Sequence, residues 1–156
     1  MEIEAKIAAG YFTEQIVPVE IASRKGTISF VTDEHIKADT TAESLAKMRP
    51  AFKKDGSVTA ASSSSISDGA AATVLLSADE AAKRGLQPLA RIVGHATYSQ
   101  APEWFTTAPV TAIEKVLQKA GWNAADVDLF EINEAFSCVA MAPIKDLGIA
   151  RDKVNV

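Results

Sequence analysis

Residues 127–136 read VDLFEINEAF and join a strand signal to a helix signal. Residues 127–132 are rich in apolar side chains and predict a strand. A helix is predicted to follow at once over 134–147, with Gly148 beyond its end and Pro143 kinking it or breaking it early. A strand that passes directly into a helix is the building unit of α/β proteins.

The residues upstream repeat this alternation. Capping-box spacings predict helices that begin at Thr40, with Glu43, and at Ser77, with Glu80. Thr107 can cap a helix with an apolar face that Gly121 ends. The remaining predicted elements are a helix over 2–10 that ends at Gly10, a hairpin from 17–21 and 28–30, and strands over 70–76 and 89–96. The order of elements predicts an α/β fold.

The last four residues, 153–156, read KVNV and resemble the start of an extended segment that has no partner. Two α/β units with nothing to close them would make a poor independent domain. We therefore expect the chain to be part of a larger fold.

Composition narrows the classes of function. The chain has 156 residues, of which 47% are hydrophobic and 23% charged, so it can bury a core. A net charge of −4 argues against a nucleic-acid partner, because phosphate binding needs clustered cations. Cys138 is the sole cysteine, which excludes an internal disulfide and a zinc-type spacing. Without a membrane-length apolar run or a signal peptide, the sequence predicts a cytoplasmic protein with no membrane partner.

Three stretches, in order, resemble the thiolase family. They are LAKMRPAF at 45–52 followed by GSVTA at 56–60, SDGAAA at 67–72, and EINEAF at 131–136. Each is weak alone, but their order and spacing also match, and the similarity runs over essentially the whole chain. The resemblance implies a partial thiolase-like α/β fold. Residues 1–87 would end the N-terminal half, including part of the loop region that covers coenzyme A, and 88–156 would begin the C-terminal half.

The resemblance also implies acyl transfer between coenzyme A thioesters, through an acyl-cysteine. In thiolases the nucleophilic cysteine lies upstream of the stretches found here, and a Gly-His-Pro histidine and a second cysteine lie downstream. Cys138 matches neither cysteine. We therefore expect this chain to be an internal piece of an acetyl-CoA C-acetyltransferase and to be inactive alone.

Asn133 is the residue to which the resemblance assigns catalysis. The matching thiolase asparagine holds a water in the oxyanion hole for an enolate, and an amide can donate there without a charge. On local sequence alone, Asn133 would be a helix N-cap. Glu134 would favour the helix dipole as a first-turn carboxylate. Ala135 and Phe136 would line the pocket near the thioester, although Phe136 could equally be a core residue.

The remaining site predictions concern coenzyme A. Ser64 matches a thiolase serine whose hydroxyl contacts the pantetheine, although the run Ser62 to Ser65 would otherwise indicate a flexible linker. Phe52 is predicted to lie against the adenine or pantetheine, and Ser44 to form a hydrogen bond near the adenine. Further coenzyme A contacts are predicted at Lys37, where the family often has arginine, and at Ala60. His35 and His95 match no catalytic position, and His95 is predicted to be a core or interface residue.

The leading hypothesis is a thiolase that condenses two acetyl-CoA molecules or cleaves 3-oxoacyl-CoA. It needs no cofactor or metal besides its acyl-CoA substrate, and the full-length protein would be a homodimer or homotetramer. The alternative is a non-catalytic piece that binds coenzyme A or assists assembly. A ketoacyl synthase or hydroxymethylglutaryl-CoA synthase fits less well, because those families do not combine the second and third stretches in this way.

Overall fold

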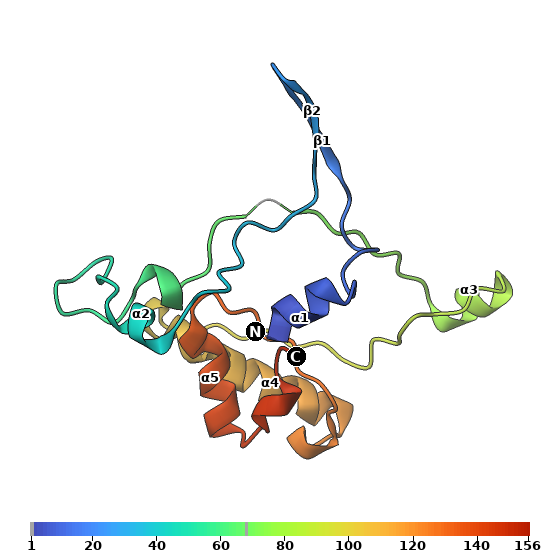
Figure 1. Cartoon of the computed structure of the whole chain (residues 1–156). Coiled ribbons are helices and arrows are strands. Elements are labelled where there is room, and N and C mark those ends of the chain that lie inside the picture. The colour runs from blue at the N-terminus through green and yellow to red at the C-terminus, as the bar shows by residue number, and fades with distance from the viewer. Residues whose placement is uncertain (1, 68) are drawn as a thin grey trace. The chain divides into compact units, whose positions relative to one another are not determined.

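The computed structural model describes residues 2–67 and 69–156, with side chains from Glu4 onward (Figure 1). Asp68, which belongs to the second thiolase-like stretch, lies outside the described residues. The chain divides into two compact units, Met1–Met48 and Arg49–Val156. Each unit is described by itself below.

The first unit contains the hairpin that the sequence predicts. Its strands are β1 (Val19–Ser23) and β2 (Gly26–Phe30), which pair antiparallel with Ile21 opposite Ile28. Gly26 adopts φ +121°, a backbone conformation that a side chain would strain, so glycine suits this turn. The hairpin is preceded by α1 (Glu2–Ala8), and Gly10 follows that helix with φ +78°. The predictions of a first helix and of a hairpin are both confirmed.

The capping residue of the second helix differs from the prediction. Helix α2 spans Ala42–Ala46, and its N-cap is Thr41 rather than Thr40. The Thr41 hydroxyl accepts a hydrogen bond from the Ser44 backbone N–H at 3.1 Å, and the Ser44 hydroxyl accepts one from the Thr41 N–H at 3.0 Å. The predicted capping box of Thr40 with Glu43 is therefore wrong by one residue. The box is formed by Thr41 with Ser44, so a serine takes the place at the third helical position where a glutamate was expected.

The regular elements of the second unit are helices and 3₁₀ turns joined by long loops. Its helices are α3 (Ala78–Lys83), α4 (Ala108–Ala120) and α5 (Ser137–Asp146), with 3₁₀ turns η1 (Ala60–Ser62), η2 (Pro102–Thr107), η3 (Ala124–Asp126) and η4 (Arg151–Lys153). The predicted N-cap Ser77 accepts from the Glu80 N–H, and Gly121 ends α4 with φ +70°. Helix α5 continues through Pro143, so of the two predicted effects of this proline the early break is wrong and the kink stays a prediction.

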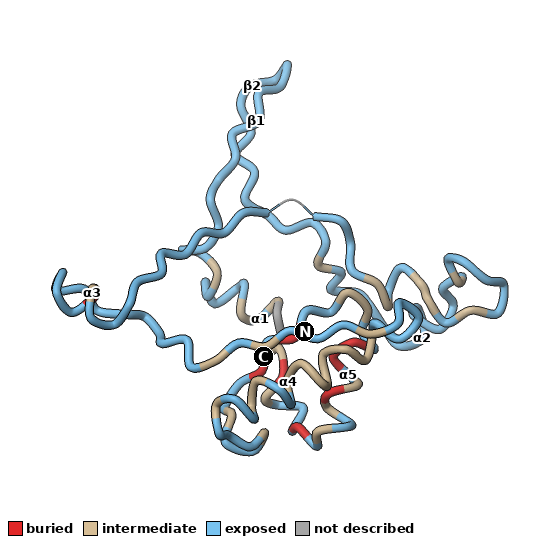
Figure 2. Tube along the Cα trace, turned by 180° about the vertical axis from the view of Figure 1, so that it is seen from behind, coloured by how far each residue is buried: buried red, intermediate tan, exposed pale blue. Residues whose placement is uncertain are grey.

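Apart from Ala81 of α3, the buried residues of the described chain lie between Phe130 and Val154, in and around α5 (Figure 2). The core cluster consists of Phe130, Ile132, Ala140, Ile149 and Val154, with Ile113 of α4 packed against it. Val154 is only 1% exposed. It forms a parallel bridge with Phe130, whose N–H donates to the Lys153 carbonyl at 2.8 Å. The final segment therefore has a partner, and the expectation that it lacks one is wrong.

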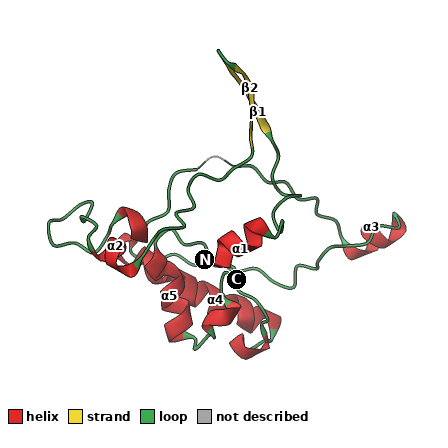
Figure 3. Ribbon diagram, viewed as in Figure 1, coloured by secondary structure: helices red, strands yellow, loops and turns green. Residues whose placement is uncertain are grey.

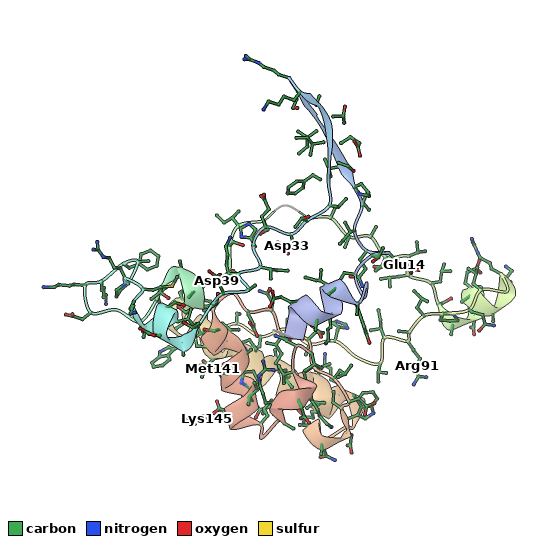
Figure 4. All side chains as sticks on the ribbon, viewed as in Figure 1. Glu14, Asp33, Asp39, Arg91, Met141 and Lys145 are labelled. Atoms are coloured by element: carbon green, nitrogen blue, oxygen red, sulfur yellow. The ribbon has the colours of Figure 1, made fainter. Side chains whose placement is uncertain are left out.

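Two predicted strands are not formed. Residues 70–76 and 89–96 are loops in Figure 3, and Leu75 and Leu89 expose 71% and 106% of their surface. Arg91, labelled in Figure 4, lies on the second of these loops. A strand requires a neighbouring backbone for its hydrogen bonds, and within the described residues neither segment has one. Residues 127–132 form only the single bridge at Phe130, so that prediction is confirmed in part.

Candidate functional site

The segment between Phe130 and α5 carries the predicted catalytic residue. Helix α5 begins at Ser137 and its N-cap is Phe136, three residues later than the sequence predicts. Asn133 therefore does not cap the helix, and Glu134 does not lie in its first turn. Both local structural interpretations of these residues are wrong. The backbone bends at Ala135 and forms a β-bridge at Phe136 before the helix begins. Asn133 instead lies on an exposed loop at the end of the bridged segment.

The neighbours of Asn133 are fixed by Asn155. The Asn155 Oδ1 accepts a hydrogen bond from the Ile132 N–H at 2.7 Å, and its Nδ2 donates to the Ile132 carbonyl at 2.9 Å. The same Nδ2 donates to the Glu134 Oε1, also at 2.9 Å. Glu134 thus has a structural contact, but with a side-chain amide rather than with a helix dipole. No local sequence pattern predicts this contact, because it joins residues 21 positions apart.

The serine run lies against the same segment. Ser63 forms an antiparallel bridge with Phe136, and the Ser64 N–H donates to the Ala135 carbonyl at 3.2 Å. The Ser64 hydroxyl donates to that carbonyl at 3.3 Å. The hydroxyls of Ser62 and Ser63 both donate to the Thr59 carbonyl. Hydrogen bonds therefore fix the run from Ser62 to Ser64, and the interpretation of it as a flexible linker is wrong.

A cavity of about 740 Å³ adjoins this junction. Asn133 and Ala135 line it from one side, and α4 contributes apolar residues that include Ile113 and Val116. The remaining lining includes the 95–100 segment and Phe105, whose ring packs edge-to-face on Phe136 at 5.9 Å between centroids. A mainly apolar cavity with a few polar groups is the usual form of a site for an organic ligand.

His95 also lines this cavity and is exposed, so its predicted place in a core is wrong, whereas a place in an interface stays a prediction. Its carbonyl accepts a hydrogen bond from the Lys119 Nζ at 2.9 Å. Gln100 is a further polar residue of the lining that the sequence did not single out, because an isolated glutamine has no diagnostic spacing. Its amide donates to the Thr107 Oγ1 at 2.7 Å. The Thr107 hydroxyl is thereby used within η2, and it caps no N–H of α4.

The other predicted coenzyme A contacts either form local hydrogen bonds or are exposed within their own unit. Lys37 and Ser44 belong to Met1–Met48. The Lys37 Nζ donates to the Glu34 carbonyl at 2.9 Å, and the Ser44 hydroxyl is used by the capping box of α2. Phe52 is 83% exposed on the 51–58 loop, which the hydrogen bond from Ala51 N–H to Val58 O closes at 2.8 Å. Ala60 is exposed at the start of η1. These roles stay predictions.

The chemistry available at the junction is that of neutral donors. Within the described residues the Asn133 amide makes no hydrogen bond, so both of its N–H groups are free for a ligand. Cys138 is exposed on α5, and its side chain is a free thiol. The part of the chain that the structure covers holds no group of three or more His, Cys, Asp or Glu that could bind a metal ion. Among those same residues, no helix is long and apolar enough to cross a membrane.

Two family models cover almost all of the chain. One is described as "Thiolase, N-terminal domain" and matches residues 2–79, and the other as "Thiolase, C-terminal domain" and matches residues 86–156. This chain belongs to the thiolase family. The family resemblance inferred from the three sequence stretches is thereby confirmed.

Individual relatives of this thiolase chain agree with the family models. It is 49% identical over 153 residues to the acetyl-CoA acetyltransferase of Rhizobium meliloti strain 1021, covering 98% of this chain and 39% of the relative. It is 52% identical over 149 residues to that of Chromobacterium violaceum, covering 95% of this chain and 38% of the relative. The chain thus spans about two fifths of the length of the curated relatives it matches.

Solved structures support the fold. The acetyl-CoA acetyltransferase of Bacillus anthracis superposes with a TM-score of 0.86 at 48% identity, over 97% of this chain and 38% of that one. Human mitochondrial 3-ketoacyl-CoA thiolase gives the same TM-score at 41% identity, also over 97% of this chain and 38% of that one. The chain therefore has part of the thiolase α/β fold, as predicted. The predicted division into halves at residue 87 stays a prediction.

Proposed function

We propose that this chain supplies one side of the active site of an acetyl-CoA C-acetyltransferase. That enzyme would condense two acetyl-CoA molecules to acetoacetyl-CoA, or cleave 3-oxoacyl-CoA with coenzyme A. The observation that carries the proposal is the junction of the serine run with the third thiolase-like stretch beside Asn133, in which Ser64 bonds to the Ala135 carbonyl and Ser63 bridges Phe136. The Ser64 to Ala135 contact joins residues that lie 71 positions apart in sequence.

Asn133 would supply the oxyanion donor. Condensation requires an enolate on the second acetyl group, and preorganised N–H donors stabilise the negative oxygen that develops. Because Asn133 does not cap α5, its side chain has no structural task that competes with this role. Its amide can donate to the enolate oxygen directly or hold a water that does so. The acyl-cysteine of such a reaction would be supplied by a residue other than Cys138, which is not part of the cavity lining.

The Ser64 side of the junction would contact the pantetheine arm. The Ser64 hydroxyl donates to a carbonyl at a long 3.3 Å and is exposed, so it can turn to a ligand at small cost. Ala135 and Phe136 would line the thioester end of the pocket. Phe52, Ala60, Lys37 and Ser44 are proposed to contact the rest of coenzyme A. In this proposal Lys37 keeps the positive charge of the usual arginine but not its planar stacking surface.

A graft into an active relative tests the proposal. This chain is 48% identical over 152 residues to the acetyl-CoA acetyltransferase of Escherichia coli, so the matching part of that enzyme can be replaced by this chain. Thiolysis of acetoacetyl-CoA by the chimera is the assay. We expect turnover by the chimera and none by this chain alone.

The Asn133→Ala change in the chimera tests the contribution of the Asn133 amide as an oxyanion donor. Removal of one oxyanion-hole donor typically lowers kcat by about 10²- to 10³-fold. Gln118→Ala removes an exposed amide side chain on α4 and is the matched control, expected to leave kcat within about twofold because it lies outside the cavity lining. A folded chimera without thiolysis activity would contradict the proposal. Calorimetry of this chain with coenzyme A would then distinguish the alternative, a non-catalytic piece that binds the ligand.

The proposal extends to partners and location. The substrate would be an acyl-CoA, and the reaction would need no cofactor or metal besides it. The full-length protein would be a cytoplasmic homodimer or homotetramer without a nucleic-acid or membrane partner. Size-exclusion chromatography with light scattering on the active chimera would measure its oligomeric state, and a monomer with full activity would contradict that part.

A further inference from the structure

The Asn155 side chain forms a complete set of hydrogen bonds around the residue before Asn133. Its Oδ1 accepts from the Ile132 N–H, while the two hydrogens of Nδ2 can each meet one acceptor, the Ile132 carbonyl and the Glu134 carboxylate. An amide that pairs with both the N–H and the C=O of one residue imitates the pairing of a neighbouring strand. It extends the Phe130 to Val154 bridge by one step toward Asn133.

The chemistry of the three partners fixes the orientation of this amide. If the amide were turned over, its oxygen would face the Ile132 carbonyl and the Glu134 carboxylate, and its NH₂ group would face the Ile132 N–H. Every contact would then be repulsive or unmade. The Glu134 carboxylate therefore acts on the amide as an orienting acceptor, and a hydrogen bond to a charged group is stronger than one between neutral groups.

The backbone of Asn155 indicates that this arrangement is held against strain. Asn155 has φ +52°, and it is the sole residue other than glycine with positive φ in the described part of the chain. Asparagine tolerates this region better than most residues, but the conformation still costs free energy. Such a conformation persists where surrounding contacts determine it. Here the contacts are the three side-chain hydrogen bonds and the Asn155 N–H to Phe130 carbonyl bond at 2.9 Å.

We propose that Asn155, oriented by Glu134, is a positioning residue for Asn133. The Asn155 amide binds the backbone of Ile132, the residue before Asn133. It also binds the side chain of Glu134, the residue after it. The Asn133 loop is thereby fixed on both sides without any use of the Asn133 side chain, which stays free to donate. This inference rests on the proposed function for its catalytic meaning, but the geometric part stands on the contacts alone.

The geometric part is tested on this chain by amide hydrogen exchange and by the NMR signals of the Asn133 side-chain NH₂. Asn155→Gly keeps a residue that adopts positive φ freely and removes the amide. We expect the Ile132 N–H to lose protection at least tenfold and the Asn133 NH₂ signals to shift. The Phe130 N–H, which donates to the Lys153 carbonyl, should stay protected. Loss of protection at both sites would mean that the change unfolds the segment and would overturn the assignment.

Two further variants test the NH₂ donor of Asn155 and the acceptor of Glu134 separately. Asn155→Asp is nearly isosteric and keeps the oxygen that accepts from the Ile132 N–H, but it replaces the NH₂ group by a second carboxylate oxygen that faces the Ile132 carbonyl and Glu134. We expect this repulsion to displace the side chain, so the variant should behave like Asn155→Gly. Glu134→Gln keeps an oxygen that can accept from Nδ2, so we expect it to keep the protection of the Ile132 N–H. Full protection in Asn155→Asp would overturn the inference.

The catalytic part is tested in the thiolysis-active chimera. A misplacement of about 1 Å can cost on the order of 10²-fold in rate, so we expect Asn155→Gly to lower kcat by tenfold or more. KM should change less than twofold, since Asn155 does not line the cavity. Unchanged kcat with lost Ile132 protection would overturn the positioning role. An inactive unmutated chimera would count against the proposed function only, and the Asn133 NH₂ signals would still decide whether Asn155 positions that side chain.

Discussion

Truncation of Val154 to alanine should destabilise the chain by about 2 kcal/mol. Val154 is 1% exposed and packs in the cluster with Phe130, Ile132, Ala140 and Ile149. Valine to alanine removes two methyl groups, each contributing about 0.8 kcal/mol, and the cavity left behind adds a few tenths more. The backbone bridge to Phe130 is retained, so the change reports on side-chain packing. At 25 °C this corresponds to about a 30-fold smaller folding equilibrium constant.

Urea unfolding followed by tryptophan fluorescence measures this loss. Both tryptophans, Trp104 and Trp122, belong to Arg49–Val156, and Trp122 lines a second cavity together with Phe130. The free energy of unfolding follows from linear extrapolation to zero urea.

Val156→Ala is the matched control, because it is the same change two residues later at a side chain that is 51% exposed. We expect it to alter stability by less than about 0.5 kcal/mol. Equal effects of the two changes, or a loss below 0.5 kcal/mol for Val154→Ala, would refute the assignment of Val154 to the core.

Three other predictions concern local geometry. Gly121→Ala should cost about 1 kcal/mol by urea unfolding, because its Cβ would meet no atom within 4 Å but φ is +70°; a loss above 3 kcal/mol would reveal a steric clash instead. A double-mutant cycle of Phe105→Leu with Phe136→Leu should give a coupling of about 0.5–1.5 kcal/mol from their edge-to-face contact, and additive effects would contradict that contact. Leu75→Ser should change the free energy of unfolding by less than about 0.5 kcal/mol, because Leu75 is exposed. A loss above about 2 kcal/mol would indicate instead that residues 70–76 form the predicted buried strand.

The sequence predicted helices and turns well because their signals are local. Ser77 caps α3 and Gly121 ends α4 as expected, since a cap is decided by residues within one turn of each other. The hairpin over β1 and β2 was predictable for the same reason, as its two strands are joined by a tight turn.

Strands without a local partner were not predictable in this way. An apolar run such as 70–76 indicates that a segment could be buried, but the strand exists only if another backbone pairs with it. The opposite error occurred at the C-terminus, where Val154 pairs with Phe130 across 24 residues that give no local signal.

The site was predictable in part. The family resemblance singled out Ser64, Ala135 and Phe136, and the structure brings these three together. The resemblance did not predict Asn155, because the role of that residue depends on its backbone conformation and on two partners that are distant in sequence. The start of α5 was also misplaced, since the backbone bridge of Phe136 to Ser63 delays the helix in a way that no cap signal encodes.

The contact between Ser64 and Ala135 also has a consequence for the order of folding. It closes a loop of 71 residues, whereas the Ile132 to Asn155 contact closes one of 23. The longer closure costs about 1 kcal/mol more chain entropy, from the logarithmic dependence on loop length. We therefore expect the Asn133 segment to acquire its backbone partners from the C-terminal side first and the serine run to dock afterwards. Pulse-labelled hydrogen exchange during refolding should show the Ile132 N–H protected before the Ser64 N–H, so that the docking of the serine run follows the ordering of the Asn133 segment.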